Sequence, residues 1–281
     1  VWLKLENHQI TGSFKVRGAY NKILSMDPSE RSRGVVTAST GNHGSAVARA
    51  GFTTDTPVTV YVPENADRSK IASAVEDGAE IVFVGSDCVE SESAAREHAR
   101  SADLTYVSPY NDVDVVIGQS TVGVEIAEQV DDLDMVVVSM GGGGLVGGVS
   151  GFLKNVDPEV RVVASSPENS CIMHQSIEAG RIIEGNSLPT LSDGTAGGVE
   201  QESITFDLCR YNIDDSVLVS EEEIANAMRL LVSRERLMVE GAAAVAVAAY
   251  MKIRDHRPDD NVAIVLCGCN VSPEVLGRVI K

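Results

Sequence analysis

Short apolar runs alternate with helical stretches along most of the chain. Between residues 34 and 109 three such units follow one another. Their apolar runs are Gly34–Ala38, Val58–Val62 and Glu80–Val84, and the helical stretches reach to Gly51, from Arg68 to Asp77 and from Glu90 to Ala102. This alternation is typical of a parallel sheet with right-handed crossovers. The pattern therefore predicts a small α/β domain over residues 34–110.

The same alternation surrounds this region on both sides. An extended run at Val1–Glu6 precedes a helix expected over Ser13–Leu24. After residue 110 the pattern predicts strands at Met135–Val138, Val160–Ser165 and Val262–Leu266, with helices at Asp114–Val130, up to Leu153, at Glu222–Ser233 and from Glu240 through Lys252. The polar, proline-containing stretch Tyr106–Asp112 predicts a return linker. We therefore expect a discontinuous large domain, residues 1–33 and 111–281, and two domains that each hold a mostly parallel twisted sheet flanked by helices.

Composition narrows the functional classes. With 281 residues and 43% hydrophobic content, the chain is long enough for real cores in one large or two modest domains. The 23 basic and 41 acidic side chains give a formal charge of −18, which argues against nucleic-acid binding. A run of about 18 apolar residues, as a membrane helix needs, is missing from the sequence. Five cysteines without paired spacing predict a reducing, cytoplasmic location.

Lys15 is the first candidate for chemistry. It lies between small residues in Gly12–Ala19, directly after the opening extended run. A lysine amine with a lowered pKa is a nucleophile that forms a Schiff base with a carbonyl cofactor such as pyridoxal phosphate. The first turn of the predicted helix favours the neutral amine, because the positive end of the helix dipole opposes a second positive charge. Taken alone, a solvated surface lysine is the commoner interpretation.

Two further stretches follow predicted strands and precede predicted helices. Ser39–Gly44 reads Ser-Thr-Gly-Asn-His-Gly, and its backbone amides should point at an anion. Gly141–Leu145 contains four glycines, which let the backbone close around a phosphate. Ligands of open α/β sheets bind at such carboxyl ends of strands. The alternatives are a simple helix cap for the first stretch and, for the second, a flexible turn or the dinucleotide spacing that Gly142–Gly147 loosely fits.

The runs Ser13–Ala19, Ser39–Gly44 and Gly141–Leu145 together, in this order and spacing, resemble the threonine and serine dehydratases (ammonia-lyases) and serine racemases. These enzymes share the pyridoxal-phosphate fold type II of the tryptophan synthase β subunit. The resemblance extends from Val1 to about Ile280. It implies pyridoxal 5'-phosphate as cofactor and a small amino acid as substrate, and we expect a homodimer or higher homo-oligomer that has no nucleic-acid or membrane partner.

The resemblance also implies roles for single residues. Lys15 would carry the cofactor and remove the α-proton as general base. The implied cofactor-binding residues are Phe14, Lys15, Asn42, Gly141, Gly142, Gly143, Gly144, Leu145 and Cys267, and the implied substrate-binding residues are Ser39, Thr40, Gly41, Asn42, His43 and Glu240. Cys267 would donate only a neutral hydrogen bond to the pyridine nitrogen. For His43 a structural role, and for Glu240 helix capping, remain alternatives.

The implied reaction is β-elimination of a hydroxy amino acid of the threonine or serine type, which gives a 2-oxo acid and ammonia. Serine racemisation and hydroxyaspartate dehydration stay open, although Thr40 replaces a serine of the racemases. From other classes, a nucleotide-dependent oxidoreductase and a non-catalytic ligand-binding protein stay open. Near Asp193 and Gly194 no residue can be matched to the family's divalent-metal site. Because the chain opens inside a strand without methionine, we expect a preceding N-terminal segment.

Overall fold

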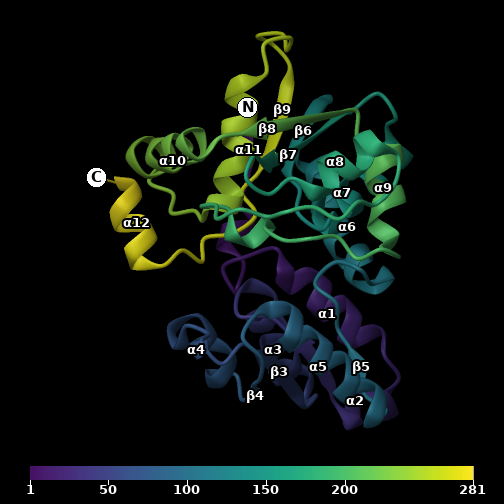
Figure 1. The fold of residues 1–281 in the computed structure, drawn as a ribbon. Helices are drawn as coiled ribbons and strands as arrows, with labels where there is room; N and C mark the ends of the chain where they lie inside the picture. Colours follow the sequence, from purple (N-terminus) through teal and green to yellow (C-terminus); the bar gives the residue numbers. More distant parts are fainter. Residues whose placement is uncertain (281) are drawn as a thin grey trace. The chain divides into compact units, whose positions relative to one another are not determined.

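The computed structural model describes residues 1–280 as two compact units. The large unit contains Val1–Phe14 and the chain from Gln119 onward. The small unit is Lys15–Gly118. Both are α/β bodies with parallel sheets flanked by helices (Figure 1), which confirms the predicted fold class. The helix α6 (Val113–Gln129) carries the chain from the small unit into the large one.

The described part of the large unit contains a five-stranded parallel sheet in the order β1-β9-β6-β7-β8. Its strands are Trp2–Lys4 (β1), Leu133–Ser139 (β6), Arg161–Pro167 (β7), Asp215–Val219 (β8) and Asn261–Val265 (β9). The central strands are nearly continuous apolar runs, because both faces of a parallel sheet are covered. Val136, Val137 and Val138 of β6 are all fully buried.

Helices cover both faces of this sheet. Figure 1 shows α10 and α11 on one side and α7, α8 and α9 on the other. Their bounds are Gly144–Val156 (α7), Ile172–Ala179 (α8), Ile204–Asn212 (α9), Glu221–Leu230 (α10), Gly241–Lys252 (α11) and Pro273–Ile280 (α12). Short 3-10 turns lie at Glu6–His8 (η1) and Asp193–Thr195 (η2), and a π-helical turn at Leu231–Glu235 (η3) follows α10.

The helix α11 forms the centre of the large core. Every residue from Gly241 to Ala249 is buried. A helix that is apolar on all sides belongs inside a protein, and its many alanines let it pack closely against β6 and β7. Its observed range agrees with the helix predicted from Glu240 through Lys252, with Glu240 as the N-cap residue.

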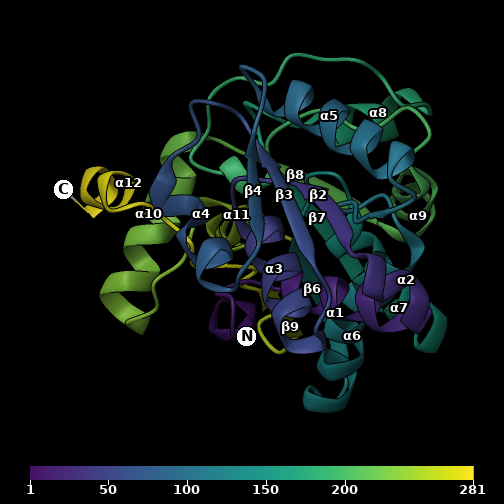
Figure 2. The ribbon, with the colours of Figure 1, turned by 90° about the horizontal axis from the view of Figure 1, so that it is seen from below.

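In the small unit, the described strands form a parallel sheet in the order β4-β3-β2-β5. They are Val35–Ala38 (β2), Val58–Val62 (β3), Glu80–Phe83 (β4) and Thr105–Tyr106 (β5). The helices are Lys15–Ser25 (α1), Pro28–Arg33 (α2), Asn42–Thr54 (α3), Arg68–Glu76 (α4) and Cys88–Ser101 (α5). Figure 2 shows α5 on one face of this sheet and α3 and α4 on the other.

The units divide the chain at other points than the predicted domains. The breaks lie after Phe14 and after Gly118, whereas the sequence predicted them near residues 33 and 110. The reason is packing: α1 buries Ala19 and Ile23 in one apolar cluster with Val47 of α3, so α1 belongs to the small unit. The predicted cofactor-side and substrate-side roles of the two domains stay predictions.

Several elements were not predicted, among them β5, α8, α9 and β8. The short strand β5 runs into the start of the stretch expected to be a linker, and Val107 directly after it is fully buried. The helices α8 and α9 and the strand β8 fall in the stretches between predicted elements. β8 starts at an exposed aspartate, and most of its residues are half exposed, as is typical of an edge strand. It therefore lacks the continuous apolar run that marks the buried strands.

Within residues 1–280, every helix is too short or too polar to serve as a membrane span. The same residues contain no group of three or more histidine, cysteine, aspartate and glutamate side chains arranged for a metal ion. The five cysteines, Cys88, Cys171, Cys209, Cys267 and Cys269, are free thiols.

Candidate active site

Lys15 is the first residue of α1, and it therefore lies in the first turn of the helix as predicted, although the helix begins two residues later than the expected Ser13. Its Nζ donates a hydrogen bond of 2.7 Å to the backbone carbonyl of Pro109. Pro109 lies beyond the end of β5, so the amine is held at the carboxyl end of a strand of the small sheet. This is the edge at which open α/β sheets bind ligands.

The segment before Lys15 is fixed to the loop that follows β9. Within the large unit, Phe14 N–H donates to the Cys267 carbonyl at 3.0 Å, and Cys269 N–H donates to the Gly12 carbonyl at 2.9 Å. Ser13 forms an isolated antiparallel bridge with Gly268. The residue that precedes the candidate lysine is therefore paired with the candidate cysteine through their backbones.

The Ser39 turn connects β2 to α3 and opens the helix as predicted, with Gly41 as N-cap. The Ser39 hydroxyl accepts a hydrogen bond from Gly41 N–H at 3.2 Å. Gly44 must be glycine, because a Cβ there would lie 2.6 Å from the Ser39 carbonyl oxygen. A Cβ on Gly41 would meet nothing within 4 Å. The turn is thus tightly closed on the helix side and open beside Gly41.

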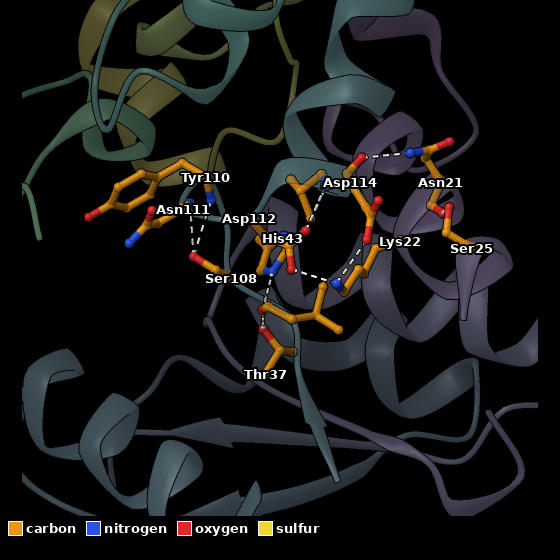
Figure 3. Close-up of polar contacts among 12 residues, drawn as sticks. Asn21, Lys22, Ser25, Thr37, His43, Ser108, Tyr110, Asn111, Asp112 and Asp114 are labelled. Carbon is orange, nitrogen blue, oxygen red and sulfur yellow. Dashed lines mark hydrogen bonds and ion pairs between the residues drawn. The ribbon is translucent and has the colours of Figure 1, made fainter. Parts of the chain in front are cut away.

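His43 is buried and held by the chain after β5. Its Nε2 lies 2.9 Å from the Val107 carbonyl, and since a carbonyl only accepts, Nε2 carries the proton (Figure 3). Burial, followed by the nearby charge of Lys15, lowers the pKa of His43 to about 3. The imidazole is therefore neutral. Among the described residues no partner reaches its buried Nδ1. This geometry supports a structural role, and a contact of His43 with substrate stays a prediction.

The glycine loop lies between β6 and α7, and α9 sets the direction of its peptides. The Thr205 hydroxyl donates to the Gly142 carbonyl at 2.6 Å, and the Cys209 thiol lies 3.7 Å from the Gly143 carbonyl oxygen. In a trans peptide the N–H points away from the carbonyl. The N–H groups of Gly143 and Gly144 therefore point away from α9.

The loop also needs its glycines for space. Gly143 has φ +85°, and a Cβ there would lie 2.8 Å from the Cys209 sulfur. A Cβ on Gly141 would lie 2.8 Å from Thr195 Cα. Because the N-cap residue of α7 is Gly143, it brings no side chain to the first amides of the helix. Such a cradle of backbone N–H groups at a helix start fits a phosphate group.

Leu145 differs from the other loop residues in its surroundings. Its side chain is buried in the apolar core of the large unit together with Val146. A cofactor contact from Leu145 would therefore come from its backbone N–H. This residue anchors the start of α7 in the core, beside the glycine loop.

Cys267 and Glu240 lie around the loop after β9. The buried Cys267 sulfur accepts a hydrogen bond from the Ser139 hydroxyl at 3.4 Å. The buried Glu240 carboxylate accepts from Asn270 N–H at 3.0 Å. A Cβ on Gly268 would lie 2.8 Å from the Glu240 carboxyl carbon, so this glycine leaves the space that the carboxylate fills.

Sequence reasoning missed the groups that support these residues. The acceptor for Lys15 is a backbone carbonyl 94 residues away, which has no residue-type signal. Thr205 and Cys209, which hold the glycine loop, belong to α9, a helix that was not predicted. Ser139, the last residue of β6, was expected in the turn after a strand that ends at Val138, and no role was assigned to it. Only the run of small residues at Gly141–Gly144 hinted that another element packs closely there.

The chain matches known proteins over nearly its whole length. The model of the family described as "Pyridoxal-phosphate dependent enzyme" matches residues 1–268. The L-threonine ammonia-lyase of Thermotoga maritima is 41% identical over 281 residues, which are 100% of this chain and 70% of that protein.

Two solved structures show the same fold. The processed form of threonine deaminase isoform 2 from Solanum lycopersicum has a TM-score of 0.92 at 31% identity, covering 99% of this chain and 81% of that one. Maize serine racemase has a TM-score of 0.92 at 30% identity, covering 98% and 85%.

Proposed function

Because the chain belongs to the family of pyridoxal-phosphate-dependent enzymes, we propose that it eliminates the β-hydroxyl of L-threonine or L-serine and releases a 2-oxo acid and ammonia. The ammonia-lyase and deaminase among its relatives support threonine as the preferred substrate. The racemase among its structural neighbours supports racemisation of serine as a second candidate.

One observation carries the proposal: the Lys15 amine is fixed at a strand end by a 2.7 Å hydrogen bond. An amine held in one place is suited to attach a carbonyl cofactor and to move a proton. The neighbouring imidazole of His43 is neutral, so it adds no second positive charge beside this amine. Lys15 is therefore the residue that we expect to carry the cofactor.

The glycine loop fits the phosphate of the cofactor, because its amides point away from α9 and side chains are absent from Gly141–Gly144. Bound pyridoxal phosphate supplies an electron sink for the substrate's α-carbon. We assign Asn42 to the cofactor's ring oxygen and the Cys267 thiol to its ring nitrogen. These two assignments rest on the match of the motifs in the sequence.

The remaining roles belong to the chain's own side chains and amides. The amides of the Ser39 turn bind the substrate carboxylate, and Lys15 takes the α-proton. The β-hydroxyl leaves with a proton as water. Hydrolysis of the released enamine consumes one water and liberates ammonia, so the overall reaction neither gains nor loses water. For threonine the product is 2-oxobutanoate, and for serine it is pyruvate.

The test follows product formation and locates the cofactor. Holoenzyme is incubated with L-threonine, and 2-oxobutanoate and ammonia are measured together. In a second sample, borohydride reduces the lysine–cofactor linkage before peptide mapping. We expect both products in equal amounts and the label on Lys15. Lys15→Ala should abolish turnover, whereas Lys154→Ala, which removes a lysine paired with Asp214, should not. A label on another lysine would overturn the assignment.

The proposal also covers the cellular compartment and the oligomeric state of the protein. The free cysteines support a reducing compartment, and we propose the cytoplasm. We also propose a homodimer or higher homo-oligomer. Light scattering coupled to size-exclusion chromatography measures the molar mass directly, and a mass of one chain would contradict the oligomer.

A further inference from the structure

Two lysines on the same face of α1 contact the chain around Pro109. Lys15 and Lys22 are seven residues apart, which is within about 20° of two complete helical turns. The Lys15 amine donates to the Pro109 carbonyl at 2.7 Å. The Lys22 amine lies 2.8 Å from an Asp112 oxygen and 3.0 Å from an Asp114 oxygen (Figure 3). Both amines therefore hold one short stretch of chain.

We call this stretch, residues 107–114, the strap. Its first end belongs to the small sheet. Val107 N–H donates to the Val36 carbonyl at 2.8 Å. The Val107 carbonyl accepts from the Thr37 hydroxyl and from His43 Nε2, both at 2.9 Å (Figure 3). Three hydrogen bonds thus fix the strap where it leaves β5.

Its other end is fixed by a carboxylate that joins two helices. One Asp112 oxygen accepts from the backbone N–H groups of Asp114 and Val115, at 2.9 and 3.1 Å, at the start of α6. The other oxygen accepts from Lys22 of α1. The Asn21 amide adds a 2.7 Å hydrogen bond to the Asp114 carbonyl. Asp112 therefore ties the beginning of α6 to α1.

The ion cluster is not a loose surface pair. The Lys22 and Asp112 side chains are 16% and 14% exposed, and that of Asp114 is 37% exposed. Burial alone would lower the pKa of Lys22, but the hydrogen bonds and charges of the two aspartates outweigh it, so this pKa is raised. Fully exposed pairs contribute little, whereas removing the cation here leaves two half-buried carboxylates without their partner.

Between its fixed ends the strap has little freedom. The Ser108 hydroxyl accepts from Asn111 N–H at 3.0 Å and from Tyr110 N–H at 3.5 Å, which closes the turn around Pro109. The proline ring restricts the backbone further. The position of the Pro109 carbonyl therefore depends on the anchors at Val107 and Asp112.

We propose that Lys22 is a positioning residue: by holding Asp112 and Asp114 against α1, it fixes the Pro109 carbonyl that receives the Lys15 amine. This inference rests on the proposed function of Lys15 and deepens it. A free lysine side chain samples many rotamers. Its amine therefore spends less time in the position from which it reacts. Lys22 acts on the reaction only through the strap.

The test compares Lys22→Met with Lys22→Arg and with a matched control, Lys154→Met. Lys154 is 17% exposed and lies 2.8 Å from Asp214, so its loss removes a similar ion pair from the large unit, to which the strap does not belong. Two kinds of quantity are measured. The first is the joining rate, which is the rate at which apo-protein forms the covalent lysine–cofactor linkage with pyridoxal phosphate; it is followed by absorbance, and the product is trapped with borohydride. The second is the pair of kinetic constants kcat and KM for L-threonine. Circular dichroism checks the fold of each variant.

For Lys22→Met we expect the joining rate and kcat to fall about tenfold, because a small displacement of the amine suffices for such a loss. KM should stay within about twofold, since the groups assigned to the carboxylate are intact. Lys22→Arg should restore most of both rates, because a guanidinium reaches two carboxylates. Lys154→Met should leave both rates unchanged.

Equal joining rates in Lys22→Met and Lys154→Met would overturn the proposal. If Lys22→Met does not fold, Asp114→Asn is tested instead, because it removes one charge and keeps the ion pair between Lys22 and Asp112. Asp114→Asn should lower the joining rate about threefold. An unchanged joining rate in this variant would contradict the proposal. If wild-type protein is labelled on a lysine other than Lys15, the proposed role of Lys15 fails, whatever the Lys22 variants show.

Discussion

The Thr205 hydroxyl donates a 2.6 Å hydrogen bond to the Gly142 carbonyl and so orients the peptide that ends in Gly143 N–H. The Ser203 hydroxyl lies 2.7 Å from Thr205 Oγ1 and limits its rotation. Because the carbonyl is turned toward α9, the N–H is turned away from it. A threonine outside the loop therefore prepares an amide of the proposed phosphate cradle.

Thr205→Val should weaken cofactor binding without unfolding the protein. Valine keeps the shape of threonine but leaves the Gly142 carbonyl without its donor, at a cost of about 1–3 kcal/mol. The peptide then loses its fixed direction, and we expect the affinity for pyridoxal phosphate to fall about tenfold. Titration of apo-protein, followed by absorbance, measures this. Thr205→Ser retains a hydroxyl and serves as the control; equal affinity in Thr205→Val and wild type would contradict the prediction.

Gly143→Ala should damage the same cradle by a different route. Its φ of +85° costs an alanine about 1–2 kcal/mol, and the new Cβ would lie 2.8 Å from the Cys209 sulfur. We expect a lower melting temperature and weaker cofactor binding. Gly151→Ala, in the same helix α7 with open space around its Cβ, should instead stabilise the fold by about 0.5–1 kcal/mol. Similar effects of both substitutions would show that the loop has no special geometry.

His43 should make the stability of the protein depend on pH. Its pKa is lowered in the folded state to about 3, from a usual value of 6.5. The unfolded chain therefore binds the proton more readily between these values. The contribution of the neutral imidazole is fully present above about pH 6.5 and is lost as the pH falls toward 3. Urea unfolding at several pH values in this window measures the decline.

His43→Gln separates this effect from the other titrating groups. An amide at this position retains a donor for the Val107 carbonyl but does not take up a proton. The fall in unfolding free energy between about pH 6.5 and pH 5 should be smaller in this variant than in wild type. His8→Gln, at an exposed histidine, should leave the fall unchanged. A fall of the same size in His43→Gln would mean that His43 does not carry the dependence.

Local sequence patterns predicted the elements whose signals lie within the element and its flanking turns. The strand Val58–Val62 has the predicted bounds, because its alternation and its flanking turn residues are all nearby in sequence. The glycine loop was found for the same reason. The strand β8 was not, because its place at the edge of the sheet is fixed by pairing with β7, about 50 residues earlier, and not by its own polar start.

The supporting residues of the site escaped prediction because their partners are far away in sequence. Thr205 meets the Gly142 carbonyl across 63 residues, and Lys22 meets Asp114 across 92. Neither residue type marks a supporting role by itself, because threonine and lysine occur at many other positions of the chain. Residue types at strand ends predict the chemistry of a site. The residues that hold those site residues in place can be identified only once the packing of whole helices is known.

The last prediction concerns the choice between the two candidate reactions on serine: elimination should outrun racemisation. The resemblance of the motifs matches Thr40, in the turn before α3, to a serine of the racemases, and its extra methyl should restrict a hydroxyl that would return a proton. At the other assigned group, the Cys267 thiol already accepts a hydrogen bond from Ser139 and is a neutral donor, so it should leave the cofactor's ring nitrogen largely unprotonated. A weaker electron sink shortens the time in which the α-carbon can be reprotonated.

The enzyme is incubated with L-serine, and pyruvate and D-serine are measured in the same samples by chiral chromatography. We expect pyruvate to form faster than D-serine in wild type, and Thr40→Ser to raise the share of D-serine because the smaller side chain frees the hydroxyl. Thr53→Ser, near the C-terminal end of α3, is the control and should leave the ratio unchanged. If wild type forms D-serine faster than pyruvate, racemisation is the main reaction. If Thr40→Ser leaves the ratio at its wild-type value, Thr40 does not decide between the two outcomes.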